Sequence, residues 1–386
     1  MSIKTDRSMS FTDRIHPLLI STLFFIMGII AAAHTLSFVA LSFLVVSALG
    51  ITLLFNQNGK RGALYLAFVI MLPFTIGFCR YTHVTHSYFT VKQLITDRSF
   101  DCTGWVSENS SQLDQKRFKH KLTVTLTSIT LPDKTVVKTP YTLTFYLLQK
   151  PLCKPGDTLS IKNITIQAPK LKFEHYLLKE SSLGTLFLPN IDYTCLSTAP
   201  YSFARISADN KQRVSTALTY KLNKLTHTLF CTIFLGTKPS NTLYLTSVKE
   251  LFSYWGIIHY LARSGLHVAL IVMIWSLLLC WLPLPYYFKQ LLLMSLIGLY
   301  TILTWSSISF IRAFVTFLLY KFCIFHSRPS HAVHILTLTT LGILTANPLQ
   351  LFFLDFQLSF ALTFALAWFN EIKIYYKNSK TIEATT

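Results

Sequence analysis

Long apolar stretches alternate with polar segments over the first 79 residues of the chain. Runs of mainly apolar residues occupy 18–34, 36–55 and 63–79. Each run has about 17–20 residues, which is enough for a helix to cross the bilayer core. The basic start and Ala31–Ala33 also resemble a cleavable signal peptide, but a second apolar run follows at once. The pattern therefore predicts three transmembrane helices in residues 1–79.

Residues 80–200 show a different pattern, in which short runs alternate between apolar and polar side chains. Lys121–Ser128 and Tyr141–Leu147 have the period of two that is typical of half-buried strands. Turn sequences such as Lys154–Asp157 separate the runs. Several short strands with polar turns favour a small barrel or sandwich, and an OB-like barrel fits the size. We therefore expect an extracytoplasmic OB-like β domain over residues 80–200.

The remaining residues have helical patterns of two kinds. Residues 201–250 mix apolar side chains with arginine and lysine, which predicts an amphipathic helix at a membrane surface and a connection. Residues 251–370 hold four or five apolar runs, which predict a transmembrane core, and a basic polar tail occupies residues 371–386. The predicted fold class is an α-helical polytopic membrane protein with an inserted small all-β (OB-like) soluble domain.

Composition and charge agree with this prediction. Hydrophobic residues make up 52% of the 386 residues, and charged residues 13%, whereas soluble domains have about 25% charged residues. The net charge is +19, and residues 80–225 alone carry 20 basic and 10 acidic side chains. Such a basic segment suggests anionic lipid headgroups or a polyanion as partner. With the N-terminus in the cytoplasm, every short basic loop falls on the cytoplasmic side. We expect a multi-pass membrane protein with both termini in the cytoplasm.

The first candidate site surrounds a Ser-Gly pair within an apolar region. It comprises His259, Arg263, Ser264, Gly265 and His267. A Ser-Gly pair lets a helix unwind, and unwound backbone at membrane depth has to be buried in protein or line a wet cavity. The alternative is a small-residue notch for close helix packing. Two histidines and an arginine are costly in such a notch, so the cluster favours a hydrated vestibule.

The second candidate site consists of polar residues within two later apolar runs. These residues are Ser309, Arg312, Asp355, Gln357 and Ser359. An arginine roughly 9 Å deep in a bilayer needs a counter-charge, a carbonyl cage or water. Asp355 is at the matching depth of its own run, and we predict that Arg312 and Asp355 form an ion pair.

A basic segment in the predicted β domain is the candidate for nucleic-acid binding. Lys116, Arg117, Lys119 and Lys121 surround Phe118. Basic side chains interleaved with an aromatic ring are suited to phosphate contacts combined with base stacking. A charged, solvated hairpin turn is the alternative interpretation.

Three further interpretations of the sequence concern cysteine, metal and hydrolase chemistry. If the β domain faces an oxidising compartment, Cys102 and Cys153 could form a disulfide, and free buried thiols are the alternative. The histidines, which include His331 and His334, could ligate a metal, but the sequence has no C-x-x-C and no H-E-x-x-H, so we expect no metal and no cofactor. Ser264, His267 and Asp355 could mimic an intramembrane serine hydrolase, although a serine and a histidine on one helix do not naturally point at each other.

Three motifs resemble the ComEC-type competence proteins, which are inner-membrane channels for DNA uptake. His259–Val268 resembles the family's His-Leu-Leu-x-x-Ser-Gly-Leu-His-Val signature, and Ser309–Ala313 its Ser-x-x-Arg-Ala motif. Asn347–Phe360 resembles its Asp-Pro and Gly-Phe-Gln-Leu-Ser-Phe motif. Leu235-Gly236 and the turn Lys154–Leu159 also fit the family pattern.

The resemblance implies a channel component of the bacterial inner membrane, not an enzyme, for the uptake of single-stranded DNA during transformation. The implied partners are single-stranded DNA, the lipid bilayer, a separate nuclease or second channel half, and further copies of the chain. Arg263, Asn347 and Asp355 depart from the family pattern. The chain also stops near the middle of the family's membrane core, before the metallo-β-lactamase-like domain that many members carry. The alternative functions are the serine hydrolase and a truncated, partner-dependent core with no transport of its own.

Overall fold

The computed structural model describes residues 17–34, 60–111, 120–167, 171–199, 202–236, 250–256, 265–304, 308–326 and 331–383. The chain divides into two compact units, one formed by Met1–Thr85 with Arg312–Thr386 and the other by His86–Ile311. Helix α3 (Lys60–Ile95) and helix α10 (Ile308–Phe325) each contribute to both units.

The first unit is helical. Besides parts of α3 and α10 it contains α1 (Pro17–Ala33), α11 (Ala332–Ala346), the 3-10 helix η5 (Pro348–Phe352) and α12 (Leu354–Glu383). Helices α1 and α3 approach each other closely where both have glycine. A Cβ on Gly28 would lie 2.2 Å from the carbonyl oxygen of Phe74, and one on Gly77 would lie 2.3 Å from that of Phe25. The two glycines therefore permit backbone contact that any larger residue would prevent.

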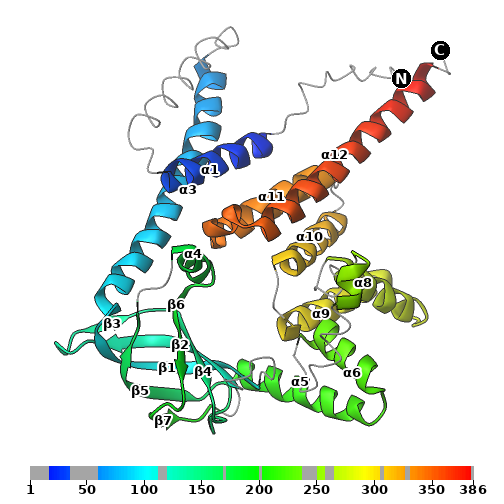
Figure 1. The fold of residues 1–386 in the computed structure, drawn as a ribbon. Helices are drawn as coiled ribbons and strands as arrows, with labels where there is room; N and C mark the ends of the chain where they lie inside the picture. Colours follow the sequence, from blue (N-terminus) through cyan, green and yellow to red (C-terminus); the bar gives the residue numbers. More distant parts are fainter. Residues whose placement is uncertain are drawn as a thin grey trace. The chain divides into compact units, whose positions relative to one another are not determined.

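The second unit combines one β-sheet with several helices (Figure 1). The strands are β1 (Ser99–Ser111), β2 (His120–Thr130), β3 (Val136–Lys138), β4 (Thr142–Leu147), β5 (Thr158–Thr165), β6 (Ser182–Leu188) and β7 (Tyr193–Ser197). The helices are α4 (Leu171–Lys179), α5 (Phe203–Thr219), α6 (Lys224–Phe230), the π-helix η3 (Cys231–Leu235), α8 (Gly265–Cys280) and α9 (Tyr286–Thr304). The strand order is β6-β4-β2-β1-β5-β7, with β3 paired to β2.

Alternation along the strands explains which face of the sheet is buried. In β2, Leu122, Val124 and Leu126 are at most 2% exposed, whereas the residues between them are half-buried. The same alternation places Leu143 and Phe145 of β4 in the core. Because neighbouring side chains of a strand point to opposite faces, the polar residues between these apolar ones lie on the outer face.

The predicted fold class is wrong on two counts. Within the described ranges, no helix combines the length and the apolar character that a bilayer crossing requires. The predicted apolar run 36–55 lies outside the described residues.

The inserted domain also differs from the predicted all-β (OB-like) one. Its sheet is mixed, because β4 and β6 pair in parallel while the other pairs are antiparallel. Helix α4 lies between β5 and β6 in the sequence and packs against β6. Alternation identified the strands, but it carries no information about the direction of their partners.

Candidate functional site

Arg312 of α10 is held by polar groups of helix α12. Its Nη1 donates hydrogen bonds to the carbonyl oxygen of Ser359, at 2.6 Å, and to the hydroxyl of Thr363. The Thr363 hydroxyl in turn donates to the same Ser359 carbonyl, at 2.5 Å. The guanidinium carbon also lies 5.4 Å from the ring centroid of Phe360. One carbonyl, one hydroxyl and one aromatic ring therefore surround the charge.

The sequence places these acceptors on one side of α12. Ser359 and Thr363 are four residues apart, so they are neighbours on the helix surface. Phe360 is 9% exposed, and Phe356 packs against it with ring centroids 4.4 Å apart. Sequence reasoning identified Ser359 and missed Thr363 and Phe360, although the four-residue spacing was a usable signal.

The predicted ion pair between Arg312 and Asp355 is not formed. Within the described part of the chain, the ion pairs are Lys92–Glu174, Lys121–Glu108 and Arg205–Asp157. Asp355 lies one turn before Ser359, is exposed, and belongs to the first turn of α12. A carboxylate there is stabilised by the positive end of the helix dipole. A carbonyl and a hydroxyl therefore take the place of the expected counter-charge.

One buried donor of Arg312 is left without a partner in the described part of the chain. Its Nε is buried and has no hydrogen-bond partner among the described residues. An unsatisfied buried donor lowers the stability of the folded protein. A ligand that accepts a hydrogen bond from Nε would recover this free energy.

The residues before Asp355 shape the turn into α12. The side-chain oxygen of Asn347 accepts from the backbone N–H of Leu349 at 3.1 Å, which caps η5. Gln357 Nε2 donates to the carbonyl oxygen of Leu351 at 2.9 Å. Gln357, which was predicted to line a vestibule, therefore closes this turn.

A second arginine of the same unit also binds backbone carbonyls. Arg80 donates from Nε to the carbonyl of Thr345, at 2.9 Å, and from Nη2 to that of Ala346, at 3.2 Å. These are the last carbonyls of α11, which have no partner within the helix. A cation at this helix end also interacts favourably with the helix dipole.

Of the predicted Ser-Gly cluster, the structure describes Gly265 and His267, while His259, Arg263 and Ser264 lie outside the described residues. Gly265 begins α8, and His267 is 9% exposed. Its ring packs edge-on against Phe234 of the π-helix η3, with centroids 6.3 Å apart. Tyr300 of α9 donates its hydroxyl to the Phe234 carbonyl at 3.0 Å. This second cluster is therefore a packed junction of η3, α8 and α9.

The structure offers no support for metal binding in the described ranges. His331 and His334 pack edge-to-face with ring centroids 5.3 Å apart. No group of three or more histidine, cysteine or acidic residues in the described part of the chain could hold a metal ion. Since Ser264 lies outside that part, the serine hydrolase stays untested.

Ser309, the remaining residue of the second candidate site, is half-buried in the first turn of α10.

The candidate nucleic-acid-binding segment and the two cysteines belong to the second unit. Lys116, Arg117 and Lys119 lie outside the described residues, and Lys121 is the second residue of strand β2. Its Nζ is 2.8 Å from Oε2 of Glu108. Burial lowers the pKa of Lys121, but the charge and hydrogen bond of Glu108 outweigh it, so the pKa is raised above its ordinary value.

Of the two alternatives left open for Cys102 and Cys153, the structure has free buried thiols and no disulfide between them. Burial raises the pKa of Cys102 to about 12, with a smaller effect from the charge of Asp101. Burial likewise raises the pKa of Cys153 to about 11. Thiols of this kind are poor nucleophiles near neutral pH.

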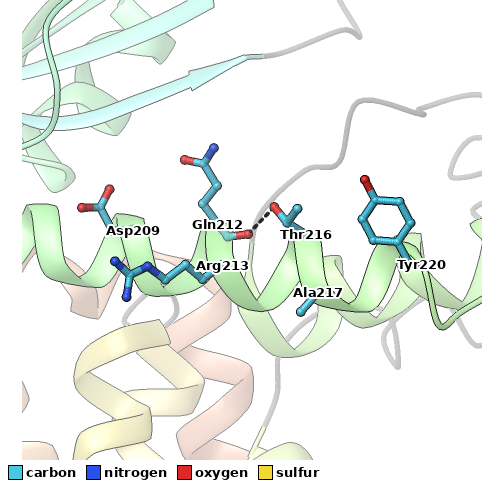
Figure 2. Close-up of a pocket in the computed structure, with 6 residues that line it drawn as sticks. All are labelled: Asp209, Gln212, Arg213, Thr216, Ala217 and Tyr220. Atoms are coloured by element: carbon cyan, nitrogen blue, oxygen red, sulfur yellow. Dashed lines mark hydrogen bonds between the residues drawn. The ribbon is translucent and has the colours of Figure 1, made fainter.

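Helix α5 carries a shallow, open pocket on one face (Figure 2). It is lined by Asp209, Gln212, Arg213, Thr216, Ala217 and Tyr220. The Thr216 hydroxyl bonds back to the carbonyl of Gln212 at 2.8 Å, and Tyr220 is 89% exposed. A single helix face of this kind brings no set of reactive groups together.

The comparisons with known proteins bear on the helical part of the chain. Residues 243–384 match the family model described as Competence protein. No curated protein and no solved structure matches the chain. The matched range includes Arg312, its partners on α12 and the turn at Asn347, and the match supports a role in competence and DNA uptake at the level of the family. The description names a competence protein and no enzymatic activity.

Proposed function

We propose that this protein acts in the uptake of single-stranded DNA during competence, as a component of the channel through which the strand crosses the inner membrane. The observation that carries the proposal is the match of residues 243–384 to the competence family. Within that range, Arg312 is a charged residue whose contacts suit a polyanionic substrate.

The proposed role of Arg312 is to attract and hold phosphate groups of the passing strand. A guanidinium that a carboxylate neutralises has little attraction left for phosphate, whereas Arg312 is bonded to a carbonyl and a hydroxyl. Arginine also presents several N–H donors in a planar fork that matches phosphate oxygens. Thr363 and Phe360 orient the side chain, so the charge is held in place before the strand arrives.

Natural transformation of a deletion strain complemented with variants tests the proposal. Arg312→Gln should lower the transformation frequency by about 10- to 100-fold, which is the size of a lost charge-assisted hydrogen bond, while Arg312→Lys should retain more activity. The matched control is Lys321→Met, which removes a cation from the same helix. Lys321 Nζ lies 5.7 Å from the Phe317 ring centroid. It lies further along α10 than Arg312, the residue that contacts Ser359. If Arg312→Gln and Lys321→Met transform equally well at equal protein levels, the role assigned to Arg312 is wrong.

A further inference from the structure

Three strands of the sheet place a cation and two aromatic rings in one row. Lys121 of β2 is in register with Tyr146 of β4, and Tyr146 is in register with Phe187 of β6. Side chains at paired positions point to the same face. The row therefore runs across the outer face of the sheet, opposite Leu122 and Phe145 of the core.

The two rings of this row are stacked and accessible. Tyr146 and Phe187 have ring centroids 4.9 Å apart and planes only 12° from parallel. Phe187 is 52% exposed, although a phenylalanine is usually among the more buried residues. A stacked pair fixed on two rigid strands is a preorganised flat surface, because neither ring loses much freedom when a third ring stacks on it.

Helix α4 adds a further ring beside the cation. Tyr176 is 50% exposed, and it is close enough to Lys121 for the two groups to influence each other's pKa. Phe173 stacks on Tyr176 with centroids 5.9 Å apart. Lys121 carries its charge throughout the physiological pH range, because its pKa is raised above its ordinary value.

The same outer face has another exposed ring at its far end. Trp105 of β1 is in register with Thr125 of β2, four residues along the strand from Lys121, and is 41% exposed. It lines a shallow depression together with Lys138 and Pro140. Four residues of strand span about 13 Å. Thr123 and Thr125 lie between the two ends on this face.

We propose that this outer face binds single-stranded DNA by stacking bases on the Tyr146–Phe187 pair and on Trp105. Lys138 contacts the phosphates, whereas Lys121 is paired with Glu108. The inference rests on the proposed function and assigns it a binding surface in the second unit. Exposed rings flanked by lysine are suited to successive nucleotides. A protein-binding patch would instead be contiguous and apolar. The excess of basic residues in 80–225 gives the charge complementarity that a nucleic acid requires.

Binding of the full-length protein to two labelled strands tests this assignment by fluorescence anisotropy. One strand is an oligothymidylate, and the other has the same length and phosphate number with abasic sites throughout. The variant Tyr146→Leu/Phe187→Leu keeps apolar side chains and removes both stacked rings. The Kd of this variant for oligothymidylate should rise by about 5- to 100-fold. Wild type and variant should bind the abasic strand with the same affinity, which is weaker than that of the wild type for oligothymidylate. Phe187→Tyr keeps a ring and should bind as the wild type does.

The matched control is Tyr220→Leu, which removes an exposed aromatic ring from the end of α5 and should leave both affinities unchanged. Unchanged binding of oligothymidylate by the folded double variant would overturn the stacking site and leave the proposed function standing. Equal losses of affinity for both strands would also overturn the stacking site, because they would mean that the double variant changes the charge or the folding of the protein. A wild type that binds neither strand, but binds vesicles of anionic lipid through these rings, would assign the face to a membrane surface. The transformation assay with Arg312 variants tests the proposed function separately.

Discussion

The Nη1 atom of Arg312 donates to the carbonyl oxygen of Ser359 at 2.6 Å, across the contact between α10 and α12. Thr363 closes this arrangement, because its hydroxyl accepts from Arg312 and donates to the same carbonyl. We expect Thr363→Val, which keeps the shape of the side chain, to lower the free energy of unfolding by about 1–3 kcal/mol. Urea unfolding followed by circular dichroism measures it.

Thr340→Val is the control for this substitution. Its hydroxyl donates to the carbonyl of Leu336 within α11 at 2.8 Å, so the substitution removes a local bond of the same kind without touching an arginine. A change within about 0.5 kcal/mol is expected. Equal losses in the two variants would show that Thr363 contributes only to its own helix.

The sequence predicted the parts of this site and not their pairing. Arg312 stands out because an arginine in an apolar run is costly, and that signal requires only the sequence. Its partner could not be read in the same way, because any backbone carbonyl can replace a carboxylate and every residue has one. Asp355 was therefore the expected partner, whereas Ser359, one turn further along, provides the carbonyl.

In the sheet, too, the sequence predicted the elements and not their pairing. The period of two correctly predicted strands at β2 and β4, and the structure buries Leu122 and Phe145 within them. The stacking of Tyr146 on Phe187 depends on the parallel pairing of β4 with β6. Those strands are more than 30 residues apart in the chain, so their pairing is a property of the tertiary fold that no local pattern carries.

The crossing of α1 and α3 should not tolerate a methyl group. An alanine Cβ at Gly77 would lie 2.3 Å from the carbonyl oxygen of Phe25, which is backbone and cannot rotate away. We expect Gly77→Ala to lower the free energy of unfolding by about 1–3 kcal/mol, as overpacking does. The midpoint of urea unfolding measures the change.

Gly342 provides the opposite case in the same unit. It lies within α11, and an added Cβ would meet nothing within 4 Å. Gly342→Ala should raise the stability by about 0.5–1 kcal/mol, because alanine is the better helix former. An unchanged stability of Gly77→Ala would contradict the close approach of α1 and α3, and a loss of stability in Gly342→Ala would contradict the open space around Gly342.

The ion pair between α3 and α4 should be sensitive to the loss of one partner. Lys92 Nζ lies 2.6 Å from Oε1 of Glu174, and the side chains are 6% and 23% exposed. Glu174→Ala leaves a buried ammonium without its counter-charge, and we expect a loss of about 3–5 kcal/mol. Lys92→Met/Glu174→Leu should recover much of this loss, because no charge is then left unpaired. Equal stabilities of the single and double variants, measured by urea unfolding, would contradict this account.

The Lys121–Glu108 pair serves as the exposed counterpart, since its side chains are 24% and 50% exposed. Glu108→Ala should cost at most about 1 kcal/mol, as surface pairs do. A loss as large as that of Glu174→Ala would mean that this pair, too, is shielded from water.

The buried thiol of Cys102 should make the second unit less stable at high pH. An unfolded cysteine titrates near pH 8.5, whereas burial raises the pKa of Cys102 to about 12 in the folded protein. Above pH 8.5 the unfolded chain therefore releases a proton that the folded protein retains, and stability falls as the pH rises toward the folded value. The slope for one group is at most about 1.4 kcal/mol per pH unit. Cys102→Ala should show a smaller slope of unfolding free energy between pH 9 and 10.5 than the wild type, and identical slopes would show that the thiol ionises freely in the folded protein.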